Sequence, residues 1–353
     1  MKKRFLALSL TLAMCLAMLT GCGGGSDTTA TDDGGSAGDS ASGTPEVTWV
    51  ASCANADDHP AVQGVHKFAE LVEEKSGGRM HIDVFANAQL ASDRDCIEGM
   101  QMNTIQSGIM VSSALAGFTD ELLVFDLPFL FDSSAQGQAL CDSDVGQQIL
   151  GTLEDIGIKG LGWMEYGMRN ITNSVRPIET PEDLQGIKIR TMENPIHMAA
   201  FQVMGADPTP MAFGELFTAL QQGTIDAQEN PLSVITSSRF NEVQDYLSMT
   251  EHVYSAAPLM VSKAAYDALP DDLKAIVDEA GTEACQWERE YLAEVEVQWL
   301  DELEAAGTQI NYPDKAPFVE AMSSVYDEFV GDGDDMVSPE LLEQVREIIS
   351  QVE

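Results

Sequence analysis

Apolar and polar residues follow two different rhythms in the chain after residue 45. Residues 47–52 and 80–85 alternate with the period of two that is typical of strands. Between them, residues 60–78 repeat apolar side chains at helical spacing and end in a Gly-Gly pair. A strand, a helix and a second strand in so short a stretch predict a parallel unit with a right-handed crossover. The pattern therefore indicates an α/β fold.

The alternation of helices and strands continues to about residue 230. The pattern predicts further helices over residues 94–104, 146–157, 195–205 and 212–223, and further strands over 107–113, 158–164, 187–191 and 224–230. A very apolar segment occupies 122–131. At 180–186 we expect a short helical turn, because Thr180 can cap it, Pro181 fits its first position and Asp183 can close a capping box.

Residues 271–306 predict one long helix. Apolar side chains recur at helical spacing through this stretch, and Gly281 is its single glycine or proline. An unbroken helix of that length would span roughly 50 Å, which exceeds one small domain. The alternative is two shorter helices with a break near Gly281.

The N-terminal residues predict export. Residues 1–21 have a charged start, an apolar run and the small-residue ending Leu19-Thr20-Gly21, and Cys22 follows. This ending resembles a bacterial lipobox, in which the cysteine becomes the lipidated first residue of the mature protein. The alternative, an uncleaved membrane anchor, is disfavoured because the apolar run is shorter than the ~20 residues that span a bilayer. Residues 22–45 then predict a lipidated cysteine and a flexible tether, and 46–353 form the body.

The charge of the chain excludes some partners and suggests another. A net charge of −40 repels nucleic acid and anionic lipid. Four of the 18 basic residues nevertheless fall between residues 169 and 190, and three others lie at residues 2–4. Because salt limits the reach of the surrounding negative field to roughly 8 Å, a local basic pocket can still attract an anion.

No familiar motif for catalysis, nucleotide binding or zinc binding occurs in the sequence. The G-x-S-x-G at 34–38 lies in the tether and is treated as chance, and the acids at 332–335 do not match a calcium loop. We therefore expect no catalytic residue, no metal and no cofactor. The five histidines are scattered and no pair has the spacing of a zinc site, so apart from His59, which is considered below, they are expected to be structural or solvated. Cys53, Cys96, Cys141 and Cys285 leave three disulfide pairings or buried free thiols open.

Arg190 is the residue best suited to hold an organic anion. It falls in a predicted strand, and its planar guanidinium presents two parallel donors that match the oxygens of a carboxylate. A buried arginine is costly without a partner, so the site would need an anion. On the pattern alone, an ion pair between Arg190 and one of the many acids of the chain is an equal alternative.

Several stretches resemble the solute-binding proteins of tripartite ATP-independent periplasmic (TRAP) transporters, the DctP family. The strongest resemblance lies in "YGMRNITNSVRPIETPEDLQGIKIRT" (166–191), in "PTPMAFGELFTALQQG" (208–223) and in "QENP" (228–231). It extends to 76–90, 125–131, 240–254 and 268–280, and so over the whole body.

The resemblance implies a two-lobed periplasmic-binding-protein-like α/β fold, with a ligand cleft between the lobes and a long bracing helix. We expect the first lobe to comprise roughly residues 46–167 and 256–285. The second would comprise roughly 168–255 and 286–353. The helix over 271–306 lies where the brace would be.

The resemblance also implies roles for four residues. Arg190 would clamp the ligand carboxylate, Arg169 would make a second cationic contact, Asn230 would hydrogen-bond the carboxylate or its neighbour, and Phe213 would pack on the apolar face of the ligand. Arg176 and Lys188 are expected outside the pocket. From the first lobe, Asn55 and His59 are expected to contribute, because they follow the first strand at the edge where α/β folds bind ligands.

The function implied is that of an extracytoplasmic receptor that delivers a small organic anion to the membrane subunits of a TRAP transporter. Val111, Ser112 and Ser113 stand where sialate-binding members carry an acid, so a C4-dicarboxylate, a keto or hydroxy acid, or a sugar acid is expected instead. The expected location is the outer face of the cytoplasmic membrane, with a lipid anchor. Alternatives are an exported lipoprotein enzyme or a ligand sensor that uses the same cleft.

Overall fold

The computed structural model describes residues 44–331 and 336–352. The predicted signal peptide, the predicted lipidation residue Cys22, nearly all of the predicted tether and the acids at 332–335 lie outside these residues. None of the helices within the described ranges is long and apolar enough to cross a membrane.

A parallel βαβ unit opens the described fold and confirms the first predicted elements. Strand β1 (Val47–Cys53), helix α1 (Pro60–Ser76) and strand β2 (Met80–Phe85) follow one another. β1 pairs in parallel with β2 and, on its other side, with β3 (Ser107–Ile109). α1 ends as predicted, because Gly77 adopts a left-handed φ of 64° and its N–H reaches carbonyls of the last helical turn.

Strand β4 (Ile158–Asn173) joins the two halves of the sheet. Most of β4 pairs antiparallel with β9 (Tyr254–Ser262), and its end, residues 169–173, pairs antiparallel with β7 (Ala227–Pro231). Next to β7 lie β5 (Lys188–Thr191) and β6 (Asp207–Pro210), which gives the strand order β2-β1-β3-β9-β4-β7-β5-β6. Two short strands, β8 (Tyr246–Ser248) and β10 (Gln309–Asn311), pair with each other, and β8 also pairs with the end of β4. Where one lobe ends and the next begins remains a prediction.

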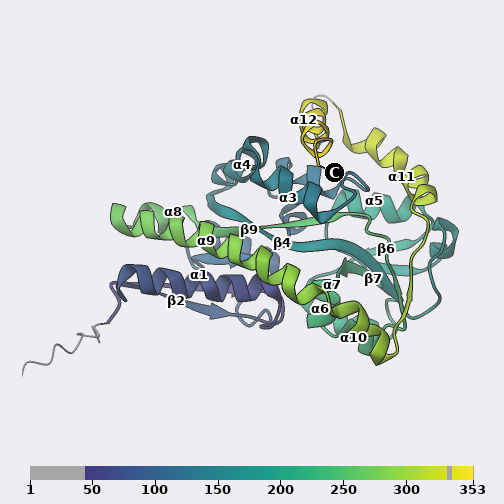
Figure 1. The fold of residues 1–353 in the computed structure, drawn as a ribbon, viewed down its shortest axis with the longest axis horizontal. Helices are drawn as coiled ribbons and strands as arrows, with labels where there is room; N and C mark the ends of the chain where they lie inside the picture. Colours follow the sequence, from purple (N-terminus) through teal and green to yellow (C-terminus); the bar gives the residue numbers. More distant parts are fainter. Residues whose placement is uncertain (1–43, 332–335, 353) are drawn as a thin grey trace, which may run out of the picture. The chain divides into compact units, whose positions relative to one another are not determined.

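Helices cover both faces of this sheet (Figure 1). Besides α1 and the two helices described below, they are α2 (Asp93–Gln101), α3 (Ser134–Asp142), α4 (Asp144–Gly151), α5 (Pro195–Val203), α6 (Phe213–Gln221), α7 (Leu232–Ser237), α8 (Lys263–Asp267), α11 (Ala316–Phe329) and α12 (Pro339–Ile349). Short 3-10 helices are η1 (Ser112–Leu115), η2 (Glu121–Asp126), η3 (Thr152–Ile156), η4 (Pro181–Leu184) and η5 (Phe240–Glu242). η4 is the predicted turn, and its predicted capping box between Thr180 and Asp183 is present.

The apolar core consists of two clusters, one on each face of the sheet. Trp163 belongs to the first cluster and its neighbour Met164 to the second, because successive side chains of β4 point to opposite faces. Each cluster continues along both halves of the sheet: the first reaches from Phe125 to Phe201, and the second from Phe68 to Phe240. The two halves of the sheet therefore share their hydrophobic packing.

Three predicted elements differ clearly from the structure, either in where they end or because they are divided. The strand predicted over 158–164 continues to Asn173, and the one predicted over 107–113 ends at Ile109, where the chain turns toward η1. The helix predicted over 146–157 is divided into α4 and η3. β4 was predicted too short because its second half is buried yet contains charged and amide side chains, which interrupt the apolar pattern.

The long helix is shorter than predicted. α9 (Asp271–Glu296) has 26 residues and spans about 39 Å, and α10 (Trp299–Ala306) is a separate helix. Val297 at the break is 79% exposed, while Trp299 turns back into the core. The alternative of a break at Gly281 is also wrong, because this residue lies inside α9. A Cβ atom there would stand 2.7 Å from the Cβ of Leu161, so the missing side chain lets α9 pack closely on β4.

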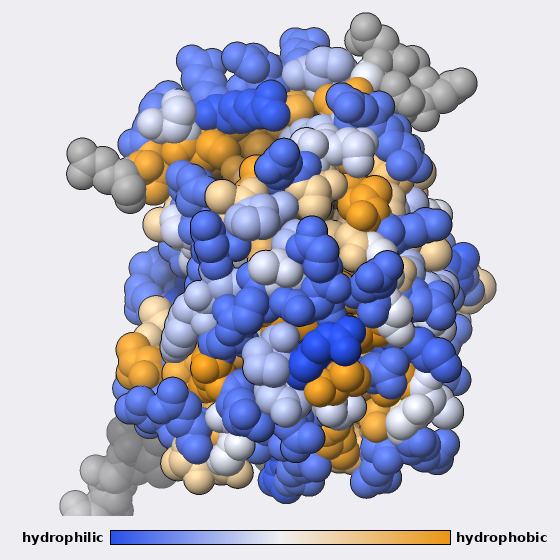
Figure 2. All heavy atoms as spheres, turned by 90° about the vertical axis from the view of Figure 1, so that its right-hand side faces the viewer, coloured by the Kyte–Doolittle hydropathy of each residue, from blue (hydrophilic) through white to orange (hydrophobic). Residues whose placement is uncertain are grey.

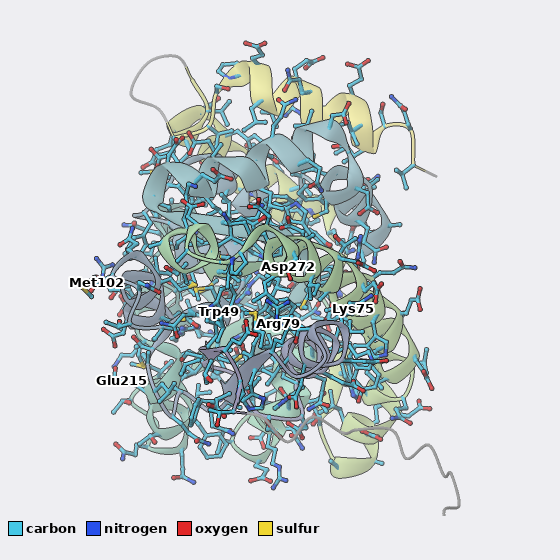
Figure 3. The ribbon with its side chains drawn as sticks, turned by 90° about the vertical axis from the view of Figure 1, so that its left-hand side faces the viewer. Trp49, Lys75, Arg79, Met102, Glu215 and Asp272 are labelled. Atoms are coloured by element: carbon cyan, nitrogen blue, oxygen red, sulfur yellow. The ribbon has the colours of Figure 1, made fainter. Side chains whose placement is uncertain are left out.

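Ion pairs fasten α9 to α1 and to the start of β2. Lys75, in the last turn of α1, lies 2.8 Å from Glu279 and 2.9 Å from Glu283 of α9. Arg79 bridges Asp272 of α9 and Glu46. Figure 3 shows Lys75, Arg79 and Asp272 together at this end of the molecule. These pairs are exposed, so their contribution to stability is small, and the close packing of α9 is the stronger attachment.

One face of the body is mostly hydrophilic, and its four cysteines are buried. Hydrophilic residues cover most of the face seen in Figure 2, and apolar residues appear there in small separate groups. All four cysteines of the body are buried and free, which answers the question that the sequence left open. Burial raises the pKa of Cys96 to about 12, so this thiol is a poor nucleophile.

Replacing Gly281 with alanine is expected to lower the free energy of unfolding by about 1–3 kcal/mol, because the added methyl would overlap Leu161. The control is Gly151→Ala at the end of α4, where an added Cβ meets nothing within 4 Å. This control should be neutral or stabilise by up to about 1 kcal/mol. Urea denaturation measures both variants. Equal stability of Gly281→Ala and the unchanged protein would show that α9 can move off β4 without cost.

Candidate functional site

Two adjoining cavities lie between the loop after β1, the N-terminus of α2 and the ends of β5 and β7. Asp93, Arg190, Met192 and Phe213 line both. The larger, of about 150 Å³, is also lined by Ser92, Arg94, Ala114, Ala116, Phe118, Glu193, Met211 and Ala212. The smaller, of about 20 Å³, is also lined by Asn55, Met110, Val111, Tyr166, Asn230 and Val234. Together they form the candidate site.

Four of the six residues predicted from the sequence meet in this site. Arg190, Phe213, Asn230 and Asn55 line the cavities. Three of them come from the second half of the sheet and its helices, and Asn55 comes from the first half. The other two predicted residues, Arg169 and His59, do not line either cavity.

Arg190 is buried, yet its guanidinium has a free edge. Its position on β5 leaves it 3% exposed, and both Nε–H and one N–H of Nη2 donate to the backbone carbonyl of Met211, at 3.0 and 2.8 Å. The edge formed by Nη1 and Nη2 has no hydrogen-bond partner among the described residues. Burial lowers the pKa of Arg190 to about 10, so the group stays charged at neutral pH. A cation held in one orientation with a free edge is suited to bind a carboxylate.

Phe213 closes one side of the space in front of Arg190. It is the first residue of α6, and its ring centre lies 6.0 Å from the Cζ atom of Arg190. A second ring, that of Phe240, packs edge-on against Phe213 at 6.3 Å and fixes its position. The aromatic face limits water around the guanidinium, which strengthens any charged hydrogen bond formed there.

Asn55 is held in place by Tyr166, a residue that the sequence analysis did not identify. Tyr166 of β4 donates its hydroxyl hydrogen to Oδ1 of Asn55 at 2.8 Å, and this bond leaves Nδ2 of Asn55 available as a donor on the cavity side. His59 lies behind this pair, with its ring 4.5 Å from that of Tyr166.

The expectation that His59 contacts the ligand needs revision. His59 is fully buried and its Nδ1 accepts the N–H of Ala61, so it caps the first turn of α1. Burial lowers the pKa of His59 to about 3, which keeps the ring neutral. Its place in the loop after β1 suggested a ligand contact, but the side chain turns toward its own helix.

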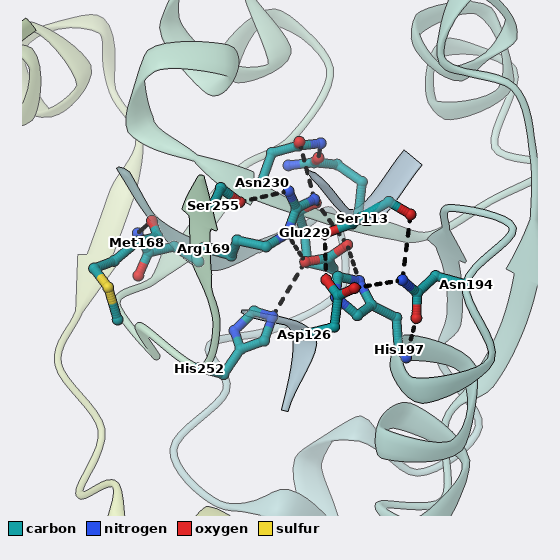
Figure 4. Close-up of polar contacts among 12 residues, drawn as sticks. Ser113, Asp126, Met168, Arg169, Asn194, His197, Glu229, Asn230, His252 and Ser255 are labelled. Carbon is teal, nitrogen blue, oxygen red and sulfur yellow. Dashed lines mark hydrogen bonds and ion pairs between the residues drawn. The ribbon is translucent and has the colours of Figure 1, made fainter. Parts of the chain in front are cut away.

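Arg169 is fully buried and already paired. Its Nε and Nη2 donate to the two carboxylate oxygens of Glu229, at 2.5 and 2.9 Å, and Nη1 donates to Ser255 at 3.1 Å (Figure 4). Nη2 also donates to Oδ1 of Asn230 at 3.0 Å. Arg169 thus stands behind Asn230 and orients its amide, where the sequence predicted a direct contact with the ligand.

A second shared bond fixes Asn230 from its other side. Nδ2 of Asn230 donates to Oε1 of Gln228 at 2.5 Å. Because an amide nitrogen carries two hydrogens, the second N–H of Asn230 remains available at the cavity.

The pair of Arg169 and Glu229 is the centre of a larger buried polar network. Two histidines face Glu229, with Nε2 of His252 at 3.1 Å and Nδ1 of His197 at 3.7 Å from its oxygens. Burial alone would raise the pKa of Glu229, but Arg169 and the histidines hold that pKa well below its usual value. Glu229 is therefore ionised throughout the neutral range.

The network reaches from β7 to the segment after β3. Asp126 accepts hydrogen bonds from Ser113 and from Asn194, the latter at 2.9 Å, and lies 3.0 Å from Nε2 of His197. Burial lowers the pKa of His197, but Asp126 and Glu229 outweigh burial and raise it to about 9. Ser113 thus serves this network and not the cavity, whereas Val111 lines the smaller cavity.

Asp93 and Tyr166 are cavity residues that the sequence did not reveal. Asp93 is the first residue of α2, which begins shortly after the carboxyl end of β2. A helix start at that edge was a usable signal, because such helices face the binding crevice of α/β folds. With 58 acidic residues in the chain, however, nothing in the composition distinguished this one.

Comparison with known proteins gives a consistent result. The family model described as bacterial extracellular solute-binding protein, family 7 (DctP), matches residues 51–332. A solute-binding protein of Verminephrobacter eiseniae is 42% identical over 75% of this chain and 79% of its own length. The 2,3-diketo-L-gulonate-binding periplasmic protein YiaO of Escherichia coli is 37% identical over 75% of this chain and 82% of its own.

A solved structure shares the fold. The sugar acid binding protein DctPAm of Advenella mimigardefordensis, in complex with galactonate, superposes with a TM-score of 0.83 at 31% identity. The match covers 88% of this chain and 99% of that one. The fold class expected from the sequence is confirmed.

Replacing Glu229 with glutamine is expected to lower the free energy of unfolding by about 3–5 kcal/mol, because Arg169 would be left buried without a counter-charge. The control is Glu242→Gln, whose side chain is 57% exposed and 4.0 Å from Arg239. The control should change stability by less than about 1 kcal/mol. Chemical denaturation measures the stability of both variants. If Glu229→Gln does not fold while Glu242→Gln does, the loss of stability is larger still and agrees with the expectation. A loss below about 1 kcal/mol for Glu229→Gln would contradict the structural importance of this pair.

Proposed function

The chain belongs to bacterial extracellular solute-binding protein family 7, and on that premise we propose that it is an extracytoplasmic receptor for a small organic acid anion. It binds the anion through its carboxylate in the cavities around Arg190 and delivers it to the membrane subunits of a TRAP-type secondary transporter. One observation supports this function most directly: Arg190 is a buried cation that lines the cavities, and its Nη1–Nη2 edge has no hydrogen-bond partner among the described residues.

Among the described residues, two arginines are buried, and they differ in whether an anion contacts them. Glu229 neutralises Arg169 in direct contact, whereas Arg190 contacts the carbonyl of Met211 and has no acid within 4.0 Å among the described residues. Removing a cation from water is costly unless an anion compensates it. A bound carboxylate would supply that anion for Arg190. The arginine is already desolvated in the folded protein, so the ion pair with a carboxylate would increase the affinity for an acid.

Other groups in the cavities suit the atoms next to such a carboxylate. Nδ2 of Asn55 and the second N–H of Asn230 are donors without a partner in the described structure, both residues line the smaller cavity, and Phe213 offers an apolar face there. In this arrangement Arg169 acts through Asn230 as a positioning residue. The diketogulonate and galactonate in the names of the relatives both carry a carboxylate, and that shared group is what we infer for this chain.

A receptor is favoured over an enzyme. The family description and the names of the relatives are those of binding proteins. A ligand sensor would use the same cavity, and a screen of ligands does not separate it from a transport receptor. The family resemblance to TRAP proteins is what supports transport.

Replacing Arg190 with lysine is expected to weaken acid binding by about 2–5 kcal/mol, because lysine keeps the charge but loses the two parallel donors. A thermal-shift screen of organic acids would first identify the ligand, since saturation at 100 times the dissociation constant adds about 2.7 kcal/mol of stability. Calorimetry then compares the unchanged protein, Arg190→Lys and Lys188→Arg, the control on the exposed start of the same strand. Near-native affinity of Arg190→Lys would remove Arg190 from the clamp.

We also propose that residues 1–21 are removed and that Cys22 is lipidated at the outer face of the cytoplasmic membrane. The charged, apolar and small-residue segments before Cys22 support this proposal. Expressed in a bacterial host, the unchanged protein should fractionate with membranes and incorporate a labelled fatty acid. Cys22→Ser should lose both properties while its ligand affinity is unchanged. A secreted, unlabelled product from the unchanged gene would contradict the anchor.

A further inference from the structure

The amide of Asn230 can donate to a bound acid only if its nitrogen faces the cavity. An amide has a carbonyl oxygen that accepts hydrogen bonds and an NH2 group that donates them, and the two fit the same space. A half turn about the last side-chain bond would therefore place an acceptor against the anion. Asn230 is buried and lines the smaller cavity, so the groups packed around it must decide its orientation.

A row of four hydrogen-bonded side chains, the polar row, leads from Asn230 through Gln228 and Thr172 to Gln244. Nδ2 of Asn230 donates to Oε1 of Gln228 at 2.5 Å, and Nε2 of Gln228 donates to Oγ1 of Thr172 at 2.8 Å. The hydroxyl of Thr172 then donates to Oε1 of Gln244 at 3.2 Å. The last three residues are buried, and none of them lines either cavity.

The pairing of β4 with β7 brings the first three residues of the polar row together. Gln228 and Asn230 are two residues apart on β7, so their side chains lie on the same face of the sheet. Thr172 of β4 stands directly opposite Gln228 in the antiparallel register. Gln244 lies between η5 and β8, and β8 pairs with the same end of β4. The register of two strand pairs therefore builds the row.

The far end of the polar row fixes the direction of its hydrogen bonds. Nε2 of Gln244 donates to two backbone carbonyls, at 3.0 and 3.4 Å. Carbonyls only accept, so Gln244 must turn its nitrogen toward them and its oxygen toward Thr172. The hydroxyl hydrogen of Thr172 then goes to Gln244, and its oxygen accepts from Gln228. Gln228 is left with its oxygen toward Asn230, which must present its NH2 group.

The cavity end of the polar row requires the same direction. Nη2 of Arg169 donates to Oδ1 of Asn230 at 3.0 Å, and a guanidinium has no acceptor. If the amide of Asn230 were flipped, its NH2 would face the donors of Arg169 and its oxygen would face the oxygen of Gln228. Two stabilising contacts would then both become repulsive. The two ends set the direction independently, because one ends in carbonyls that only accept and the other in a cation that only donates.

We propose that Gln228, Thr172 and Gln244 are positioning residues of the binding site, which hold the amide of Asn230 with an N–H available to the bound acid. The inference rests on the proposed function, because it takes an acid to lie in the cavity. It extends the site to three residues that do not line the cavity. A donor that is already oriented need not be ordered when the acid binds, and this lowers the free-energy cost of binding.

The test removes one hydroxyl from the polar row. Thr172→Val keeps the branched shape, which suits a strand, but deprives Gln228 of its acceptor. Thr172→Ser keeps the hydroxyl, and Gln244→Met breaks the row at its far end. The control is Thr236→Val on α7. Thr236 does not line the cavities and its hydroxyl has no hydrogen-bond partner among the described residues, so the same change breaks no bond there.

Calorimetry at pH 7.5 measures the affinity of each variant for galactonate, 2,3-diketogulonate and succinate, which represent the acids in the names of the relatives. For each probe that binds the unchanged protein, Thr172→Val and Gln244→Met should weaken the affinity by about 3- to 10-fold, the value of one neutral hydrogen bond. Thr172→Ser and Thr236→Val should stay within about twofold of the unchanged protein.

Nuclear magnetic resonance of protein with 15N-labelled asparagine separates positioning from a general loss of stability. The Nδ2 signals of Asn230 are identified by their loss in Asn230→Asp. Before any acid is added, they should shift in Thr172→Val and return in Thr172→Ser. A role of Thr172 in stability alone would lower the free energy of unfolding but leave these signals and the affinity of the folded protein unchanged.

Two results would overturn the inference without touching the proposed function. One is an affinity within about twofold of the unchanged protein for both Thr172→Val and Gln244→Met. The other is a Thr172→Ser variant that does not restore the affinity lost in Thr172→Val. In both cases Arg190→Lys would still lose tight binding. If no acid binds in this assay or in the thermal-shift screen, or if binding does not depend on Arg190, the proposed function and this inference fail together.

Discussion

A buried guanidinium with one satisfied edge is the interaction on which the site depends. The carbonyl of Met211 holds Nε and Nη2 of Arg190, and this contact determines where the free edge points. The carbonyl is in place because Met211 follows β6, which pairs in parallel with β5, the strand of Arg190. The register of β5 and β6 therefore determines how the guanidinium of Arg190 is oriented at the cavities. The desolvation cost of that cation falls only when an anion reaches it.

The neighbouring arginine shows the other use of a buried cation. Arg169 and Glu229 form a diagonal ion pair across the antiparallel strands β4 and β7. Two histidines and Asp126 extend the network into the segment after β3. The network fixes Asn230 and crosses from one part of the sheet to another. A buried network in which Arg169, Glu229, Asp126 and Asn230 all have hydrogen-bond partners rigidifies its surroundings. Arg169 therefore provides the rigid support, and Arg190 provides the free donors.

The sequence predicted the parts of the fold whose signals are local. β1, α1 and β2 followed from the periodicity, Gly77 ended α1, and the capping box at Thr180 was present. The resemblance to the TRAP family supplied Arg190, Phe213 and Asn230, which the structure places at one cavity. The end of α9 was missed because the apolar stripe continues through the break at Val297, so its period does not change where the helix does.

Features that depend on contacts distant in sequence could not be predicted in the same way. The partner of Arg169 is Glu229, 60 residues later, and nothing local separates it from the other acids. A ligand contact was predicted for His59, but His59 caps a helix and Asp93 lines the cavity. This difference depends on how the loops after β1 and β2 fold onto the sheet.

The most direct test of the central claim is a high-resolution crystal structure of the chain with the acid that binds most tightly. One carboxylate oxygen of the ligand should accept from Nη1 of Arg190 and the other from Nη2, while the bonds from Nε and Nη2 to the carbonyl of Met211 persist. A ligand whose carboxylate lies elsewhere, for example on Arg94 at the solvent edge, with the free edge of Arg190 still unoccupied by it, would contradict the claim.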